Sequence, residues 1–302
     1  MYLYHYGIQE LPFTLTPNTR YFFGLPSHKE AIQVLLNSLK SGEGFIKVTG
    51  EVGTGKTLIC RKLLNELPEH FVTAYIPNPY LTPSELRRVV ASELDVALTD
   101  KTDQQEFTQR IQQCLINIHQ EGKCAVLIID EAQALPIESI EALRLMTNLE
   151  TESRKLLQVV LFGQPELNQK LSLPELRQLK QRVTFSYTLR LMDPEQLYQY
   201  VKHRMNVAGY RGDDLFDRKC CSLLFKASKG TPRIVNVLCH KALMLAYGEG
   251  KHKINRAHIS LSTKDTEAAT QTTSILLKLS ISVLAIVLTL GLAYFAWLRL
   301  AI

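Results

Sequence analysis

Short apolar segments alternate with amphipathic ones through the first 190 residues of the chain. The stretches between the apolar segments repeat apolar residues at helical spacing and predict helices. Strands that alternate with helices are typical of a parallel sheet covered by helices on both faces. We therefore predict one α/β domain over residues 1–190. Its predicted strands are Phe45–Thr49, Phe71–Ile76, Ala125–Ile129, Leu156–Phe162 and Val183–Leu189.

Two segments have the capping-box pattern, in which a Ser or Thr is followed three residues later by Glu. They are Ser27–Glu30 and Thr82–Glu85, and each predicts the start of a helix. From residue 191 the strand pattern stops, and we predict a small helical lid domain over residues 191–262. Its helices are expected from Asp193, over Phe216–Lys226 and over Pro232–Tyr247.

The C-terminal end of the chain has a different composition. Residues 263–277 are rich in Thr, Gln and Ala and predict a linker. The stretch 279–298 has no charged residue, and about 20 apolar residues in a helix span roughly 30 Å, the thickness of the hydrocarbon core of a bilayer. We predict a transmembrane helix over 278–299 that contacts membrane lipid through 279–298. A buried helix is the alternative, but no core for it is evident after a polar linker.

The segment from residue 50 to residue 57 has the P-loop pattern, in which a loop bounded by glycines is followed by Lys and Thr. Glycine lets successive backbone N–H groups point inward and bind phosphate oxygens. Lys56 offers a positive charge for the β- and γ-phosphates, and Thr57 a hydroxyl for Mg²⁺. The residues predicted to bind ATP are Gly50, Glu51, Val52, Gly53, Thr54, Gly55, Lys56, Thr57 and Asp130.

A second acidic motif supports this interpretation over a chance match to a glycine-rich turn. Asp130 and Glu131 follow the fully apolar run Ala125–Ile129, which predicts a central strand buried on both faces. Ligands bind at the carboxyl ends of such strands. We expect Asp130, with Thr57, to hold Mg²⁺, and Glu131 to act as the general base for the attacking water.

The charge and the cysteine content of the chain indicate which partners and which cellular location to expect. The 302 residues have a formal net charge of +6, and no long basic stripe is evident, so the composition gives little support for nucleic-acid binding. The six cysteines show no metal-site spacing and are expected to be reduced. Reduced thiols and an ATP site both favour a cytoplasmic location for the domain that binds the nucleotide.

With these motifs in place, the chain resembles an AAA+ ATPase of the ExeA (general secretion pathway A) family. Within that family it is most similar to members associated with assembly of the mannose-sensitive haemagglutinin (MSHA) type IV pilus. The resemblance covers residues 1 to about 260 and the predicted span. It rests on Pro12-Phe13, Thr16-Pro17-Asn18, Thr49–Thr57, Asp130-Glu131-Ala132-Gln133, Asn148-Leu149-Glu150-Thr151, Gly163-Gln164-Pro165-Glu166-Leu167 and Gly230-Thr231-Pro232-Arg233.

The resemblance implies roles for three further residues. Gln164 would be the sensor amide for the γ-phosphate or the attacking water, with a helix cap as its alternative role. Arg233 would be a second sensor that approaches the γ-phosphate from the lid. Arg182, or Arg177 as its rival, would be an arginine finger offered to the ATP of a neighbouring subunit, and a surface ion pair is the alternative for both. A finger acting on a neighbour requires a ring or arc of subunits, such as a hexamer.

The resemblance also implies a function. We expect an inner-membrane ATPase that crosses the membrane once near its C-terminus and keeps its ATPase domain in the cytoplasm. Its partners would be pilus or secretion assembly proteins, and its reaction the hydrolysis of ATP. Two alternatives stay open: a DNA-binding AAA+ helper ATPase of the transposition type, and a nucleotide-gated scaffold with little turnover.

Overall fold

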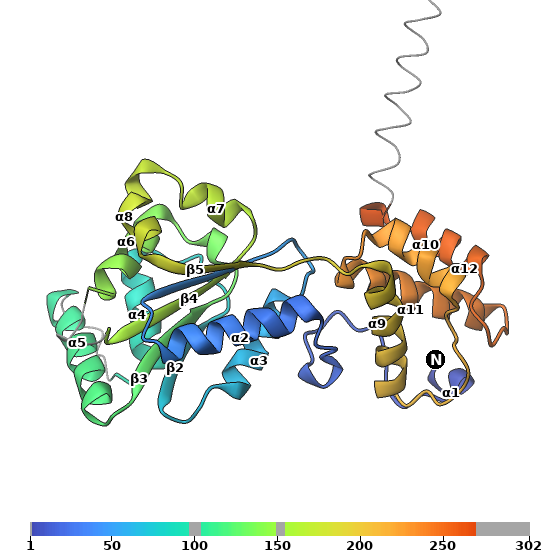
Figure 1. The fold of residues 1–302 in the computed structure, drawn as a ribbon, viewed down its shortest axis with the longest axis horizontal. Coiled ribbons are helices and arrows are strands. Elements are labelled where there is room, and N and C mark those ends of the chain that lie inside the picture. The colour runs from blue at the N-terminus through green and yellow to red at the C-terminus, as the bar shows by residue number, and fades with distance from the viewer. Residues whose placement is uncertain (1, 97–103, 149–154, 270–302) are drawn as a thin grey trace, which may run out of the picture. The chain divides into compact units, whose positions relative to one another are not determined.

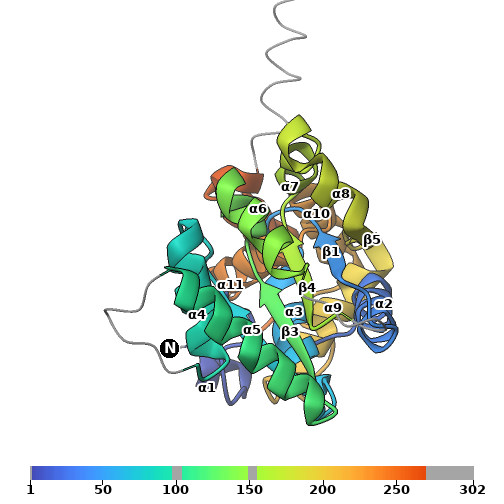
Figure 2. The ribbon, with the colours of Figure 1, turned by 90° about the vertical axis from the view of Figure 1, so that its left-hand side faces the viewer.

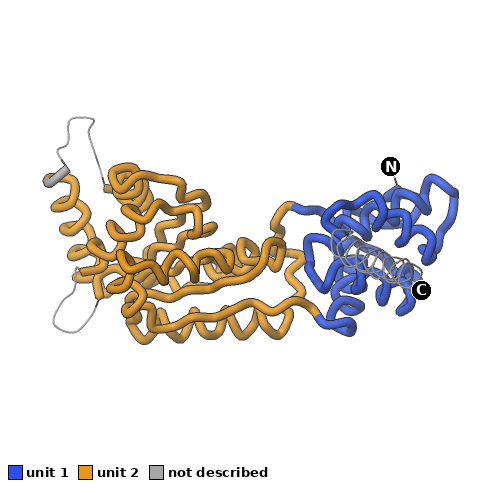
Figure 3. The backbone as a smooth tube through the Cα atoms, turned by 90° about the horizontal axis from the view of Figure 1, so that it is seen from above, with its two compact units in different colours: residues 1–15, 193–302 blue, residues 16–192 orange. Residues whose placement is uncertain are grey.

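The computed structural model describes residues 2–96, 104–148 and 155–269 of the chain. These residues form two compact units, one of residues 16–192 and one that combines residues 1–15 with the chain from residue 193 onward (Figure 3). We call them the sheet unit and the helical unit. The predicted membrane helix over 278–299 lies outside the described residues. Within the described ranges, no helix is long and apolar enough to cross a membrane.

The sheet unit is built on five strands in the order β2-β3-β4-β1-β5 (Figure 1). Every neighbouring pair is parallel, which confirms the predicted parallel sheet. β1 and β3, the strands that lead into the two predicted motifs, are parallel neighbours of β4. Their carboxyl ends therefore lie at the same edge of the sheet. The strands are β1 (Phe45–Thr49), β2 (Phe71–Ile76), β3 (Cys124–Ile129), β4 (Leu157–Gly163) and β5 (Val183–Thr188).

Helices cover both faces of this sheet, each over an apolar core. On one face α2 and α3 pack against alternate residues of the strands, among them Val48 and Phe162. On the other face α4, α5 and α6 pack against Leu127 and Leu161, and Figure 2 views the unit from the side of α4 and α5. The helices are α2 (Pro26–Lys40), α3 (Lys56–Glu66), α4 (Pro83–Glu93), α5 (Gln104–Gln120), α6 (Ile137–Met146), α7 (Glu166–Lys170) and α8 (Arg177–Arg182).

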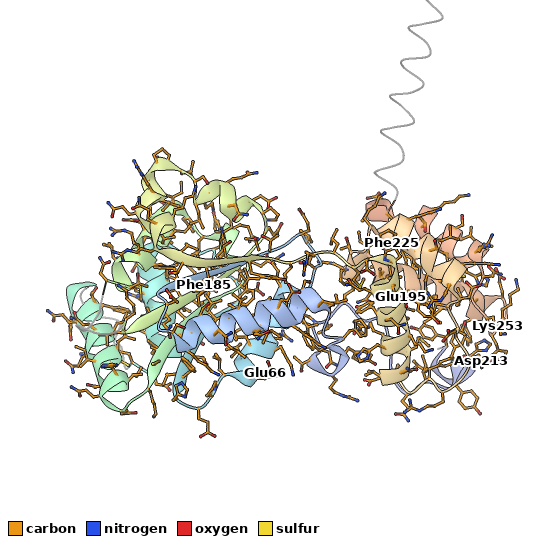
Figure 4. All side chains as sticks on the ribbon, in the orientation of Figure 1. Glu66, Phe185, Glu195, Asp213, Phe225 and Lys253 are labelled. Carbon is orange, nitrogen blue, oxygen red and sulfur yellow. The ribbon has the colours of Figure 1, made fainter. Side chains whose placement is uncertain are left out.

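The edge strand β5 is the least covered part of the sheet. Its residues are half-buried or exposed, and Phe185, labelled in Figure 4, is 40% exposed. The other four strands, β1 to β4, contribute buried residues to the cores on the two faces and form the buried centre of the unit.

One of the two predicted capping boxes is present and the other is wrong. Thr82 and Glu85 form the predicted reciprocal hydrogen bonds at the start of α4. α2, in contrast, begins at Pro26, and no side chain caps it. Proline is well suited to the first turn of a helix because it lacks the N–H that would need a cap. Glu30 instead accepts hydrogen bonds from Tyr187 and Arg190 at the end of β5.

The described part of the helical unit, up to residue 269, contains four longer helices and the short α1 (Figure 1). Three of the longer helices match the predicted ones. The fourth, α12, was not predicted; Asn255 and His258 form a capping box at its start, and buried His258 and Ile259 anchor it. α12 runs into the beginning of the predicted linker. The helices are α1 (Leu3–Tyr6), α9 (Pro194–Val207), α10 (Arg218–Ser228), α11 (Pro232–Gly248) and α12 (Arg256–Lys264).

The first 15 residues group with the helical unit, which differs from the prediction of one domain over residues 1–190. The Tyr6 hydroxyl donates to the carbonyl of Leu243 at 3.1 Å. Buried Arg204 donates through Nε to the carbonyl of Pro12 at 2.5 Å. These contacts explain the grouping, because the Tyr6 side chain and the Pro12 carbonyl of the N-terminal segment form hydrogen bonds with α11 and α9.

Candidate nucleotide-binding site

The P-loop of the sheet unit is the turn between β1 and α3, and its glycines are structurally required. Gly53 and Gly55 have φ of 81° and 102°, a region that residues with a Cβ seldom adopt. At Gly50 the reason is space, because a Cβ there would lie 2.8 Å from Oγ1 of Thr54. The sequence therefore permits a tight loop whose backbone can approach a phosphate closely.

Lys56 lies inside the curve of this loop. It is 5% exposed, and its Nζ donates to the carbonyls of Gly50 at 2.7 Å and Glu51 at 3.1 Å. Burial lowers the pKa of Lys56, and the nearby carboxylates of Glu131 and Asp130 act in the opposite direction. A buried cation whose own hydrogen bonds go only to carbonyls is well placed to exchange them for phosphate oxygens.

Thr57 and Asp130 bring the two predicted motifs together. The Thr57 hydroxyl donates to Oδ2 of Asp130 at 2.6 Å, across 73 positions in the chain. Asp130 is 2% exposed, and its Oδ1 accepts from the backbone N–H of Glu131 at 2.9 Å. Burial raises the pKa of Asp130, while these two hydrogen bonds oppose that effect. A hydroxyl and a carboxylate at this distance are oxygen ligands of the kind that Mg²⁺ prefers.

Glu131 follows directly and has a left-handed backbone, with φ of 52° and ψ of 38°. Such a conformation is uncommon for a residue with a side chain and is often found at functional sites. Its Oε2 accepts from Nε2 of Gln133 at 2.5 Å and from Nε2 of Gln164 at 3.1 Å. Partial burial disfavours the charged carboxylate, but these two amides and the charge of Lys56 outweigh it and lower the pKa of Glu131.

Gln133 is the residue of this site whose contacts the sequence did not predict. Its Oε1 accepts from the backbone N–H of Gln164 at 2.9 Å while its Nε2 binds Glu131. Lys170 in α7 donates to its carbonyl at 2.6 Å and so ties down the turn. One amide side chain thus joins the ends of β3 and β4. The only signal in the sequence was its place two residues after the acidic pair.

The predicted arginine fingers lie away from the P-loop of their own chain. Arg182 ends α8 at the amino end of β5, where its Nη1 donates to Oδ1 of Asn148 at 2.5 Å. The P-loop follows the carboxyl end of β1, which is parallel to β5. The five steps from Val183 to Thr188 correspond to roughly 16 Å at the usual rise of a strand. Arg177 is the first residue of the same helix, five positions before Arg182.

Arg233 lies in the helical unit, where it is exposed in the first turn of α11. The structure therefore brings together the P-loop residues, Asp130, Glu131 and Gln164, all of which belong to the sheet unit. Arg182, also in the sheet unit, lies outside that cluster.

Residues 39–171 match the protein family described as "AAA domain". This range includes the P-loop, the acidic pair and Gln164. The sheet unit has the AAA P-loop fold. The chain is also 41% identical over 262 residues to General secretion pathway protein A of Aeromonas hydrophila, an alignment that covers 87% of this chain and 48% of that protein. The chain is thus related to that secretion protein and spans about half of its length.

Solved structures show the same AAA fold at low identity. Cdc6p of Pyrobaculum aerophilum has a TM-score of 0.64 at 16% identity, covering 84% of this chain and 70% of that one. The ORC2 protein of Aeropyrum pernix has a TM-score of 0.62 at 16% identity, covering 82% and 68%. The RuvB Holliday junction branch migration motor of Thermotoga maritima has a TM-score of 0.54 at 17% identity, covering 84% and 73%. At these identities the likeness shows the fold alone.

Proposed function

We propose that this AAA protein is a membrane-anchored ATPase that hydrolyses ATP to support assembly of a type IV (MSHA-like) pilus or a related secretion machine. The observation that carries the ATPase part is the meeting of Thr57 and Asp130, 2.6 Å apart, beside buried Lys56 and the Glu131 carboxylate. The relation to General secretion pathway protein A supports the assembly part. So does the resemblance of the motifs to those of the pilus protein MshM.

The residues present fit Mg²⁺ together with a nucleotide. Thr57 and Asp130 would hold the ion through their oxygens, and the bound ion would supply positive charge against the phosphates. The P-loop has no Cβ at Gly53 and Gly55, so phosphate oxygens can approach the backbone N–H groups there closely. Lys56 adds a charge-assisted hydrogen bond from inside the loop.

Glu131 is the general base in this proposal. Its lowered pKa keeps it ionised at neutral pH, so its carboxylate can accept a proton from water. Gln164, which hydrogen-bonds Glu131 at 3.1 Å, is placed to orient the same water or to sense the γ-phosphate. Because both amide donors bind one carboxylate oxygen, Oε2, they also orient the side chain of the base.

The two remaining predicted residues, Arg233 and Arg182, would act together with the helical unit or with a neighbouring subunit. Arg233 would approach the γ-phosphate from the helical unit and act as a second sensor. Arg182 lies at the amino end of β5, whereas the P-loop of the same chain follows the carboxyl end of the parallel strand β1. This separation supports a role of Arg182 on the ATP of a neighbouring subunit. A ring or arc oligomer, such as a hexamer, is the assembly that would pair each finger with a neighbour's site.

The concentration dependence of ATP turnover by the 302-residue protein in detergent, with light scattering for mass, tests this function. We expect turnover per subunit to rise as oligomers form and to fall at least about tenfold in Arg182→Ala. The control Arg190→Ala removes an exposed arginine that pairs with Glu30 and should leave turnover unchanged. Tight ATP binding by a monomer that shows no turnover at any concentration would support the scaffold alternative instead.

A second candidate function, DNA handling, is favoured by the charge distribution. Residues 1–15 and 193–269 contain 13 Lys and Arg but 9 Asp and Glu, whereas residues 16–192 contain 20 of each. Within residues 1–269 the excess of positive charge thus belongs to the segments that form the helical unit, which would suit a polyanion. Retention on duplex DNA that falls steeply with salt, and that Lys226→Glu and Lys229→Glu abolish, would support this candidate. Salt-independent or absent retention would exclude it.

A further inference from the structure

We propose that His28 is a positioning residue that holds the P-loop in its phosphate-binding conformation, an inference that rests on the proposed nucleotide binding. His28 lies in the first turn of α2 and is 5% exposed. Its Nε2 is 3.0 Å from the carbonyl oxygen of Thr54, the residue before Gly55 in the P-loop. Because the partner is a carbonyl, which can only accept, Nε2 must carry the proton.

The direction of that hydrogen bond decides where the next N–H group points. The carbonyl of Thr54 and the N–H of Gly55 belong to one planar trans peptide, so they point in opposite directions. His28 holds the carbonyl on the α2 side of the loop and thereby holds the Gly55 N–H on the opposite side. In P-loops such N–H groups form the concave surface that binds phosphate. A flipped peptide would present a carbonyl oxygen to the phosphate instead.

The packing around His28 leaves its ring little freedom. A Cβ on Gly55 would lie 3.3 Å from Cε1 of His28, so the imidazole packs directly against the glycine backbone. The ring also lies near the ring of Phe22, with a centroid distance of 6.0 Å and an interplanar angle of 26°. Burial lowers the pKa of His28, which favours the neutral ring. A buried, neutral donor packed against the loop is suited to positioning rather than to proton transfer.

The other hydrogen bonds of the loop do not replace this contact. The Thr54 hydroxyl donates to the carbonyl of Glu51 at 2.8 Å, and Lys56 donates to Gly50 and Glu51. These bonds connect the P-loop to itself and to the start of α3, and a phosphate would compete for Lys56. The hydrogen bond from His28 comes from a separate helix and involves no group that would bind the phosphate, so it persists in both states.

A matched pair of amides separates this role from simple packing. The amide nitrogen of Gln reaches about as far as Nε2 of His, whereas that of Asn is one methylene shorter. We therefore expect His28→Gln to retain binding of a fluorescent ADP analogue within about twofold, and His28→Asn and His28→Leu to weaken it about tenfold, the value of one lost hydrogen bond. KM for ATP should rise by the same factor while kcat changes less than about twofold. His240→Leu, in the helical unit, is the control for loss of a histidine elsewhere.

All variants are compared as the 302-residue protein in detergent, with thermal unfolding measured without nucleotide. If His28→Leu does not fold, the Gln and Asn variants alone still decide the question. Equal affinity in His28→Asn and wild type, or equally weak affinity in His28→Gln and His28→Asn, would overturn the inference while leaving the proposed function intact. If the wild type binds no nucleotide, the proposed function fails, and this inference fails with it.

Discussion

The two units of the chain both bury polar side chains, but they use them differently. In the sheet unit Lys56, Asp130 and Glu131 converge at the carboxyl ends of parallel strands, where the charge of Lys56 interacts with the two carboxylates and each carboxylate accepts a side-chain hydrogen bond. In the helical unit buried Arg204 and Asn236 bind backbone carbonyls and a tyrosine hydroxyl. Buried polar groups with fixed backbone partners stabilise a fold, whereas a cluster of ionisable groups at strand ends is equipped for chemistry.

Loss of Lys56 should have the largest effect, and it should be confined to the sheet unit. We expect Lys56→Ala to weaken ATP binding by at least about 100-fold, because a buried ammonium makes charge-assisted hydrogen bonds to the phosphates. Equilibrium binding of a fluorescent nucleotide measures this. Lys62→Ala is the matched control, since Lys62 lies in the same helix and pairs with Glu66 at the surface. Similar losses in both variants would contradict the assigned role.

Loss of Arg204 should be the largest effect confined to the helical unit. Arg204→Ala would leave the Pro12 carbonyl and the Tyr200 hydroxyl without this donor, and we expect a loss of about 2–3 kcal/mol in the free energy of unfolding. Hydrogen exchange should then rise in α9 and α11 and stay unchanged in β1, β3 and β4. Arg211→Ala, at an exposed position, is the control. If Arg204→Ala destabilised both units equally, the stabilising role of Arg204 would not be confined to the helical unit.

Gln133→Leu should have an intermediate effect that depends on pH. The Gln133 amide helps to lower the pKa of Glu131, so its removal raises that pKa. Because the general base must be ionised, the acidic limb of the pH–rate profile should move to higher pH. Turnover at the plateau should fall less than about tenfold. An unshifted limb would show that Gln133 does not act on the base; Gln113→Leu, at an exposed position of α5, is the control.

The smallest effect is expected on the surface of the helical unit. Lys226 and Lys229 are exposed and lie at the C-terminal end of α10. Because cations at the C-terminal end of a helix interact favourably with its dipole, reversing both charges should lower the free energy of unfolding by about 1 kcal/mol and leave ATP turnover unchanged. Differential scanning calorimetry and a phosphate-release assay measure these quantities. A large loss of turnover would mean that this surface takes part in the proposed ATPase cycle.

The sequence predicted the sheet unit well because its signals are local. Five short apolar runs located the strands, and the fully apolar run before Asp130 marked a strand buried on both faces. The glycines and Lys56 identified the loop, because few other arrangements need those residue types at that spacing. The helix starts were less certain. Ser27 and Glu30 fit a capping pattern, yet Pro26 begins the helix and Glu30 pairs with Arg190.

Features that depend on distant contacts could not be predicted in the same way. The first 15 residues contain buried Tyr2, Tyr6 and Phe13, but no periodicity long enough to show which unit they would join. The role of Gln133 depends on the meeting of β3 and β4, which only the folded sheet produces. Nor did the sequence link His28 to the P-loop, because the two are 26 positions apart and meet only through the packing of α2.

The most direct test of the central claim compares wild type and Glu131→Gln in one set of samples, with ATP binding and Mg²⁺-dependent phosphate release measured together. The account predicts that Glu131→Gln binds ATP within about threefold of wild type and hydrolyses it at least about 100-fold more slowly, since only the general base is lost. Full turnover in Glu131→Gln would contradict the assignment of the site's chemistry.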